Sequence, residues 1–207
     1  NIKQYQTLSF FSIVLVMLPF IYFFWKTTPE AFDAKNLFLF ALVIISSLIA
    51  NFFAFYSLKW EKIDNIEPAR VLEPLFIILL TVIFSLFFDN NLYERNLKVI
   101  IPALIAGLAL VFSHVKRHHL SFNKYVIAAI FGSFFFALEL IISRLILNYY
   151  SPISFYFIRC SAIFLISLII FHPKLTNLDK KTNWFILLTG VVWFVYRIVL
   201  YYGYIHY

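Results

Sequence analysis

Apolar residues occur along the chain in seven long blocks that short polar stretches separate. Each block is close to the roughly 20 residues that a helix needs to cross about 30 Å of hydrocarbon. The blocks show no alternation with a period of two residues, so helices are favoured over the strands of a membrane barrel. The pattern predicts an all-α, polytopic transmembrane bundle of about seven helices, at residues 8–25, 37–58, 71–88, 97–115, 125–147, 153–171 and 184–204.

The connections between the blocks are short. Residues 148–152 (NYYSP) predict a tight turn, with Pro152 at the start of the next helix. The longest polar stretches, 59–73 and 172–183, are too short to fold as separate soluble domains. Residues 1–207 are therefore expected to form a single transmembrane domain.

Composition excludes a soluble protein. Of the 207 residues, 63% are hydrophobic and 13% are charged, and the mean hydropathy is +0.88. The charged side chains are too few and too clustered to cover the outer surface of a soluble chain. With four glycines and seven prolines, the collagen-like and disordered classes are excluded as well. The single cysteine, Cys160, excludes an internal disulfide framework and Cys-rich metal sites.

The formal net charge of +7 indicates a membrane surface rather than nucleic acid. The basic residues form short clusters between the apolar blocks, where they meet anionic lipid headgroups. Loops on the N-terminal side carry ten of them and the opposite loops carry four, which places the N-terminal side in the cytoplasm. The expected partners are the lipid bilayer, as for a multi-pass protein of the cell membrane, and a small-molecule substrate. Nucleic acid is not expected, and the oligomeric state stays open.

Several short motifs follow one another from Ala50 onward. They are a helix end at 55–59 (FYSLK), a Pro-led helix start at 72–77 (LEPLFI), the Glu94-Arg95 pair ahead of Pro102 and Gly107, and the stretch from Gly132 to Arg144 followed by Ser151-Pro152 and Arg159. In this order they resemble the EamA-like branch of the drug/metabolite transporter superfamily. The resemblance implies ten helices in two five-helix repeats of inverted topology, with the seven blocks equivalent to helices two to eight.

An internal repeat accompanies this resemblance. At an offset of 146 residues, 55–58 (FYSL) align with 201–204 (YYGY), and Asn51 aligns with Arg197. The end of a first repeat is expected over 1–115 and the start of a second over 116–207, as part of a longer protein. Duplicated transporters bind substrate near the membrane midplane, at the interface between repeats. A segment equivalent to helix two would begin outside the cell, opposite to the charge bias, so both orientations stay open.

Glu139 is the clearest ionisable residue inside an apolar block. Such a group costs several kcal/mol in the bilayer unless it faces a cavity or a partner. Helical spacing places it on one face with Gly132, Phe136 and Ser143, a small and polar stripe suited to a bundle interior. The functional hypothesis is a proton- or cation-binding carboxylate in a central cavity. The structural alternative is an interhelical pair with an arginine.

Arg197 lies deep in the last block, on a face with Gly190, Trp193, Tyr201 and Tyr204. An arginine that faced lipid there would be expensive, so an inward position is expected. Arg197 then either binds a carboxylate or phosphate of the substrate between aromatic walls or forms a structural salt bridge with Glu139.

Three further polar residues are candidates with weaker arguments. Arg159 lies about two turns into its block and Arg144 near a block end, so both are expected to reach the interface by snorkelling. Arg159 also keeps a substrate role as an alternative. Asn51 shares a face with Ser47 and Ala54, and its amide either contacts substrate or joins helices.

No motif indicates an enzyme or a metal centre. His114, His118 and His119 lie beside Lys116 and Arg117 without a nearby carboxylate, which favours a solvated cationic loop. The sequence contains no H-E-x-x-H, Gly-rich phosphate loop or G-x-S-x-G motif. Neither a cofactor nor an enzymatic activity is expected. The leading interpretation is a transporter of small organic metabolites or amphipathic compounds by alternating access; the alternatives are a lipid-modifying membrane enzyme and a non-transporting scaffold.

Overall fold

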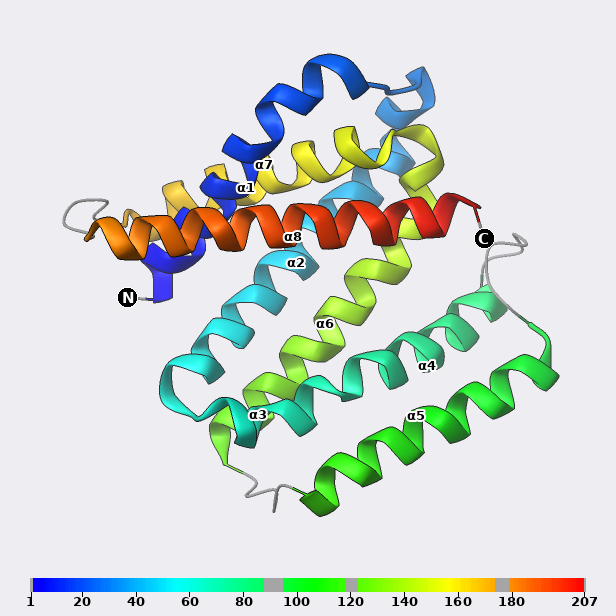
Figure 1. Cartoon of the computed structure of the whole chain (residues 1–207). Helices are drawn as coiled ribbons and strands as arrows, with labels where there is room; N and C mark the ends of the chain where they lie inside the picture. The colour runs from blue at the N-terminus through cyan, green and yellow to red at the C-terminus, as the bar shows by residue number, and fades with distance from the viewer. Residues whose placement is uncertain (1, 88–94, 118–122, 174–178, 207) are drawn as a thin grey trace. The chain divides into compact units, whose positions relative to one another are not determined.

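The chain folds as an assembly of helices, seen here in a computed structural model that describes residues 2–87, 95–117, 123–173 and 179–206 (Figure 1). Those residues contain no strand, and only an isolated bridge joins Thr27 to Tyr150. The all-α prediction is confirmed. In chain order the elements are α1 (Ile2–Phe24), η1 (Pro29–Phe32), α2 (Ala34–Trp60), α3 (Ile63–Arg70), α4 (Leu72–Phe87), α5 (Leu97–Arg117), α6 (Lys124–Ile146), η2 (Leu147–Tyr149), α7 (Pro152–Phe171) and α8 (Lys180–His206).

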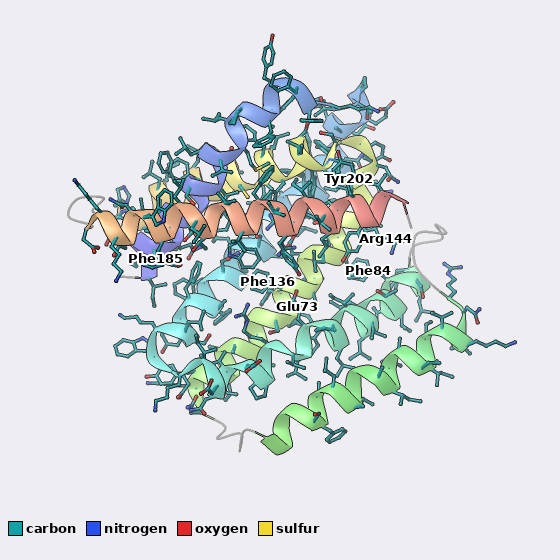
Figure 2. All side chains as sticks on the ribbon, viewed as in Figure 1. Glu73, Phe84, Phe136, Arg144, Phe185 and Tyr202 are labelled. Atoms are coloured by element: carbon teal, nitrogen blue, oxygen red, sulfur yellow. The ribbon has the colours of Figure 1, made fainter. Side chains whose placement is uncertain are left out.

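Within the described ranges, six helical segments are long and apolar enough to cross a bilayer. They are α1, α2, α3 with α4, α6 with η2, α7 and α8, whereas the apolar part of α5 is shorter, at Leu97–Ser113. Large apolar side chains are exposed along these helices, among them Phe185 on α8 (Figure 2). Lipid is the solvent that makes such a surface stable, so the chain is a multi-pass integral membrane protein.

Two compact units divide the chain. Unit 1 comprises Asn1–Ile44 and Ser143–Tyr207, and unit 2 comprises Ile45–Ile142. Helices α2 and α6 therefore contribute residues to both units. Compactness does not report on sequence duplication, so the repeat boundary after residue 115 stays a prediction.

In unit 1, helix α1 packs against α7 and α8. The rings of Phe11 on α1 and Phe164 on α7 have their centres 5.3 Å apart. On the other side, the Ser12 hydroxyl donates to the Ile186 carbonyl of α8 at 3.0 Å. Gly190, one turn further along α8, faces the same serine. Small side chains at this contact allow two helix backbones to approach closely, as is common in membranes.

The Gly190→Ala variant is expected to lower thermal stability, because the added Cβ would collide with Ser12 Oγ and lie 3.0 Å from the Ser12 carbonyl carbon. Overpacking of this kind costs about 1–3 kcal/mol. Gly203→Ala is the matched control on the same helix, since nothing lies within 4 Å of its added Cβ. Melting temperatures in detergent should fall for Gly190→Ala and stay equal or rise for Gly203→Ala; equal behaviour of both variants would contradict the close approach.

The predicted turn at residues 148–152 is confirmed. Pro152 is the first residue of α7, and Ser151 caps the helix by accepting a hydrogen bond from the Ser154 N–H at 3.1 Å. The Ser151 N–H in turn donates to the Lys26 carbonyl at 2.9 Å, which ties this turn to the segment after α1. The two connections thus fix the start of α7 within unit 1.

In unit 2, the polar stretch at 59–73 contains the end of α2, helix α3 and the first residues of α4. Ile66 and Ala69, three residues apart on α3, are both 1% exposed and pack with Val126 and Ala129 of α6. Residues at this spacing lie on one helix face, so burial of two apolar side chains stabilises α3 despite its polar composition.

Candidate functional site

Arg159 lies in the second turn of α7 and is only 2% exposed. Its Nη1 donates a hydrogen bond to the hydroxyl of Tyr201 on α8. Its guanidinium carbon also lies 5.2 Å from the ring centre of Tyr156, within range of a cation–π interaction. The expectation that Arg159 snorkels to the interface is therefore wrong, because a hydroxyl from the neighbouring helix provides an acceptor inside the protein.

Arg197, on α8, is 3% exposed, in agreement with the inward position expected for it. Its guanidinium carbon lies 5.8 Å from the ring of Trp193 and 6.0 Å from the ring of Tyr196. Trp193 is half-buried, whereas Tyr196 is exposed. Aromatic rings thus accompany this arginine along its own helix, as the spacing of Trp193 and Arg197 predicts.

Two buried tyrosines join the arginines. Tyr156 and Tyr201 have ring centres 6.1 Å apart, and Tyr201 follows Arg197 by four residues on α8, so these two share a helix face. We refer to Tyr156, Arg159, Arg197 and Tyr201 as the arginine–tyrosine cluster; all four belong to unit 1 and are at most 3% exposed. Sequence reasoning missed Tyr156, although it precedes Arg159 by three residues and so shares its helix face.

Arg144 occupies a different position from these two arginines. It lies in the last turn of α6 and is half-buried, with its guanidinium carbon 5.7 Å from the ring of Tyr204 (Figure 2). A place near a helix end allows a long cationic side chain to reach the membrane interface, and for Arg144 this stays a prediction.

Glu139 and Ser143 lie four residues apart on α6, and each is completely buried. This agrees with the inward position expected for Glu139. Asn51 on α2 is half-buried, and its Nδ2 donates to the Ser47 carbonyl of the same helix at 2.8 Å. The Asn51 amide therefore serves its own helix, which favours a structural role over contact with substrate.

Buried charges are few in the part of the chain that the structure describes. Only three charged side chains are buried among them: Glu139, Arg159 and Arg197. In unit 1 the acidic residues are Glu30, Asp33 and Asp179, and all three are exposed. An ionised group costs several kcal/mol in the bilayer, so the burial of each of these side chains requires polar or charged partners within the protein.

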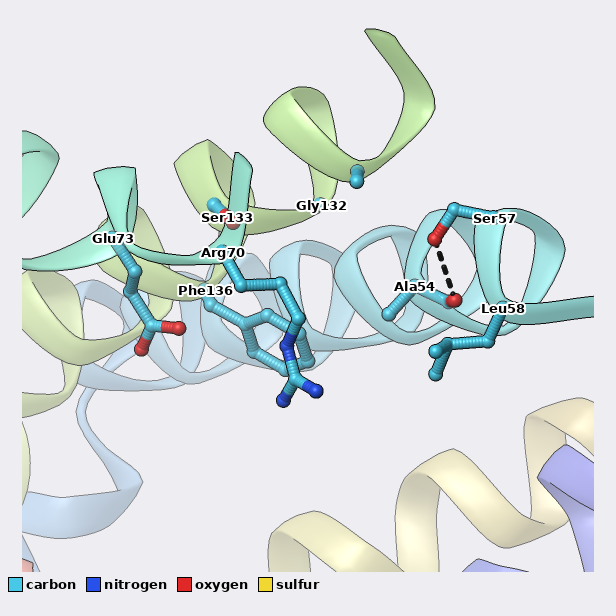
Figure 3. A pocket seen from close by; sticks show the side chains of 9 residues that line it. Ala54, Ser57, Leu58, Arg70, Glu73, Gly132, Ser133 and Phe136 are labelled. Carbon is cyan, nitrogen blue, oxygen red and sulfur yellow. Dashed lines mark hydrogen bonds between the residues drawn. The ribbon is translucent and has the colours of Figure 1, made fainter. Parts of the chain in front are cut away.

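A small cavity lies in unit 2, where sequence reasoning expected none. It is lined by Ala54, Ser57, Leu58, Arg70, Glu73, Ala129, Gly132, Ser133 and Phe136 (Figure 3). Figure 3 shows the charged ends of Arg70 and Glu73 directed to the same side of it. Its free volume of about 10 Å³ is close to what one water molecule requires, so it does not admit an organic metabolite.

The histidine cluster is only partly within the described residues. His114 belongs to helix α5 rather than to a loop, and His118 and His119 lie outside the described residues. Across the ranges that the structure describes, no three His, Cys, Asp or Glu side chains gather in a way that could hold a metal ion.

A polar cluster in unit 2 perturbs one carboxyl group. Asn65 Nδ2 donates to Glu61 Oε1 at 2.8 Å, and Asn123 Nδ2 donates to Glu61 Oε2 at 2.5 Å. These two hydrogen bonds favour the ionised form and hold the pKa of Glu61 below its ordinary value. Their stabilising effect is present above the ordinary glutamate pKa of about 4.3 and is lost as the pH falls through the lowered value. At neutral pH, the hydrogen bond from Asn123 to Glu61 therefore connects the start of α6 to the end of α2.

Replacing Asn65 or Asn123 with alanine is expected to raise the pKa of Glu61, with the larger change for Asn65→Ala. A pH titration of carboxyl-labelled protein by NMR measures this directly. Glu30, which belongs to the other unit, is the internal control and should titrate unchanged. A Glu61 pKa that is the same in both variants and in the original protein would show that the amide hydrogen bonds do not form.

Comparison of the chain with models of known protein families, with characterised proteins and with solved structures finds no match in any of the three. The resemblance to EamA-like transporters and the inverted repeat therefore stay predictions.

Proposed function

We propose that this membrane protein transports a small organic metabolite by alternating access. The observation that carries the proposal is the burial of Glu139, Arg159 and Arg197 within helices that are apolar enough to span the bilayer. Ionisable groups in such helices are expensive and are characteristic of substrate pathways, proton relays and ligand sites. A scaffold that only packs helices together has no need of them.

The proposal draws on two further expectations. The order of motifs from Ala50 onward resembles EamA-like transporters, and the offset of 146 residues is consistent with duplicated halves. Transporters built from repeats bind substrate at the membrane midplane and expose the site to each side in turn. We place the protein in the cell membrane on the same grounds.

Uptake by the purified protein in proteoliposomes tests the proposal. A panel of radiolabelled anionic, neutral and cationic metabolites should contain at least one that enters faster than it enters protein-free vesicles. Arg197→Gln should abolish that uptake. Lys181→Gln, which removes an exposed positive charge from the same helix, should leave it unchanged. Conversion of vesicle lipids without solute uptake, detected by mass spectrometry, would replace transport with an enzymatic function.

A further inference from the structure

Two membrane-spanning helices end beside each other in unit 2 (Figure 1). The span formed by α2 ends at Trp60, and the span that begins with α6 starts at Lys124. The rings of Trp60 and Tyr125 are stacked with their centres 6.4 Å apart, and the ring of Tyr56 lies 5.7 Å from that of Tyr125. A spanning helix leaves the hydrocarbon near its ends, so these rings mark one interface between lipid and water, where tryptophan and tyrosine are favoured.

A lysine lies over each ring of the stacked pair. Lys59 Nζ is 4.4 Å from the ring centre of Trp60, and Lys124 Nζ is 5.2 Å from that of Tyr125. Both lysines are exposed, and neither ammonium group has a hydrogen bond or an ion pair with a described residue. Cation–π contacts hold both side chains against the rings. Two positive charges therefore have defined places at the membrane surface.

The carboxylates nearest in the sequence are bound or lie on another face. Both oxygens of Glu61 accept hydrogen bonds, one from Asn65 and one from Asn123. Asp64 and Glu67 are exposed on α3, and helical spacing places them away from the face that packs on α6. These three carboxylates therefore leave the two lysines available to an anion from outside the chain.

An apolar surface continues from this pair into the membrane. Ile127 and Phe131 follow Lys124 by three and seven residues, so they share its face of α6. They are 44% and 51% exposed, and the ring of Phe131 stacks on that of Phe53 on α2 with centres 5.9 Å apart. A ligand that is anionic at one end and hydrocarbon at the other matches this sequence of positive charge, aromatic rings and apolar side chains.

We propose that Lys59 and Lys124 bind the phosphate headgroup of an anionic phospholipid, with an acyl chain along Ile127 and Phe131. The stacked rings of Trp60 and Tyr125 position the two ammonium groups at the depth of the headgroup. Basic positions between membrane-spanning helices bind anionic headgroups, because each lysine near the surface attracts them. The site lies on the outer surface of unit 2 and does not depend on the proposed transport activity.

Native mass spectrometry of the full chain in detergent tests this proposal. The protein is titrated with dioleoyl phosphatidylglycerol and with dioleoyl phosphatidylcholine, which have the same acyl chains and differ by one negative charge. Phosphatidylglycerol should bind about 10- to 30-fold more tightly, since each of two lysines contributes about fivefold. Lys59→Gln/Lys124→Gln should bring the ratio of the two affinities close to one, whereas Lys59→Arg/Lys124→Arg should keep it.

The matched control is Lys26→Gln/Lys35→Gln, which removes two exposed lysines from unit 1 and should keep the original ratio. Both lipids are measured on the same preparation, so the ratio does not depend on the fraction of protein that is folded. Inorganic phosphate at millimolar concentration should not displace phosphatidylglycerol, because it lacks the acyl chains. Equal affinity of the original protein for both lipids, an unchanged ratio in Lys59→Gln/Lys124→Gln, an equal loss in the control, or displacement by inorganic phosphate would overturn the proposal.

Discussion

The Glu139→Gln variant should lower solute uptake in proteoliposomes at least about tenfold, the effect of about 1.4 kcal/mol. Glu139 is the only buried carboxylate among the described residues, and glutamine keeps its shape while removing its charge. Ionisable groups inside membrane-spanning helices are characteristic of substrate pathways and proton relays, so the loss of this charge should impair transport.

The control for this prediction is an exposed carboxylate in the membrane-flanking part of the chain. Asp179→Asn, just before α8, removes one negative charge from the surface and should leave uptake unchanged. Exposed charges are screened by water and salt, so they contribute little inside the membrane. Undiminished uptake by Glu139→Gln would leave Glu139 with a structural role only.

The Arg159→Gln variant should lower the melting temperature of the protein in detergent, because it removes the guanidinium that donates to the Tyr201 hydroxyl inside unit 1. Loss of a buried hydrogen bond to a charged group costs about 1.5–3 kcal/mol. Lys181→Gln, which removes an exposed charge, is the control and should melt at the original temperature. Equal melting temperatures of both variants would contradict the hydrogen bond.

Local signals in the sequence predicted local structure well. Ser151 and Pro152 form a strong helix-start signal between two apolar blocks, because a serine caps a helix and a proline suits its first position. In the structure they occupy these two positions at the start of α7. Helix α3 was missed because its composition is polar and only Ile66 and Ala69 indicate a buried face. Two apolar residues are too weak a periodic signal when the helix that covers them lies some sixty residues away in the chain.

Position along a block predicted the burial of Glu139 and Arg197 but not that of Arg159. All three lie within runs of apolar residues, and the free-energy cost of a charge that faces lipid applies to each. Arg159 lies near the start of its block, so snorkelling to the interface was expected. No feature of the sequence indicates that Tyr201, on another helix, provides a hydrogen-bond acceptor for it. Contacts between distant segments depend on helix rotation and register, which hydropathy does not determine. The cavity beside Arg70 and Glu73 was missed for the same reason.

The most direct test of the account is an experimental structure of the full chain in a lipid bilayer. We predict that the side chains of Glu139, Arg159 and Arg197 are shielded from the lipid tails, as their burial indicates. Contact of any of the three with lipid tails would contradict the account.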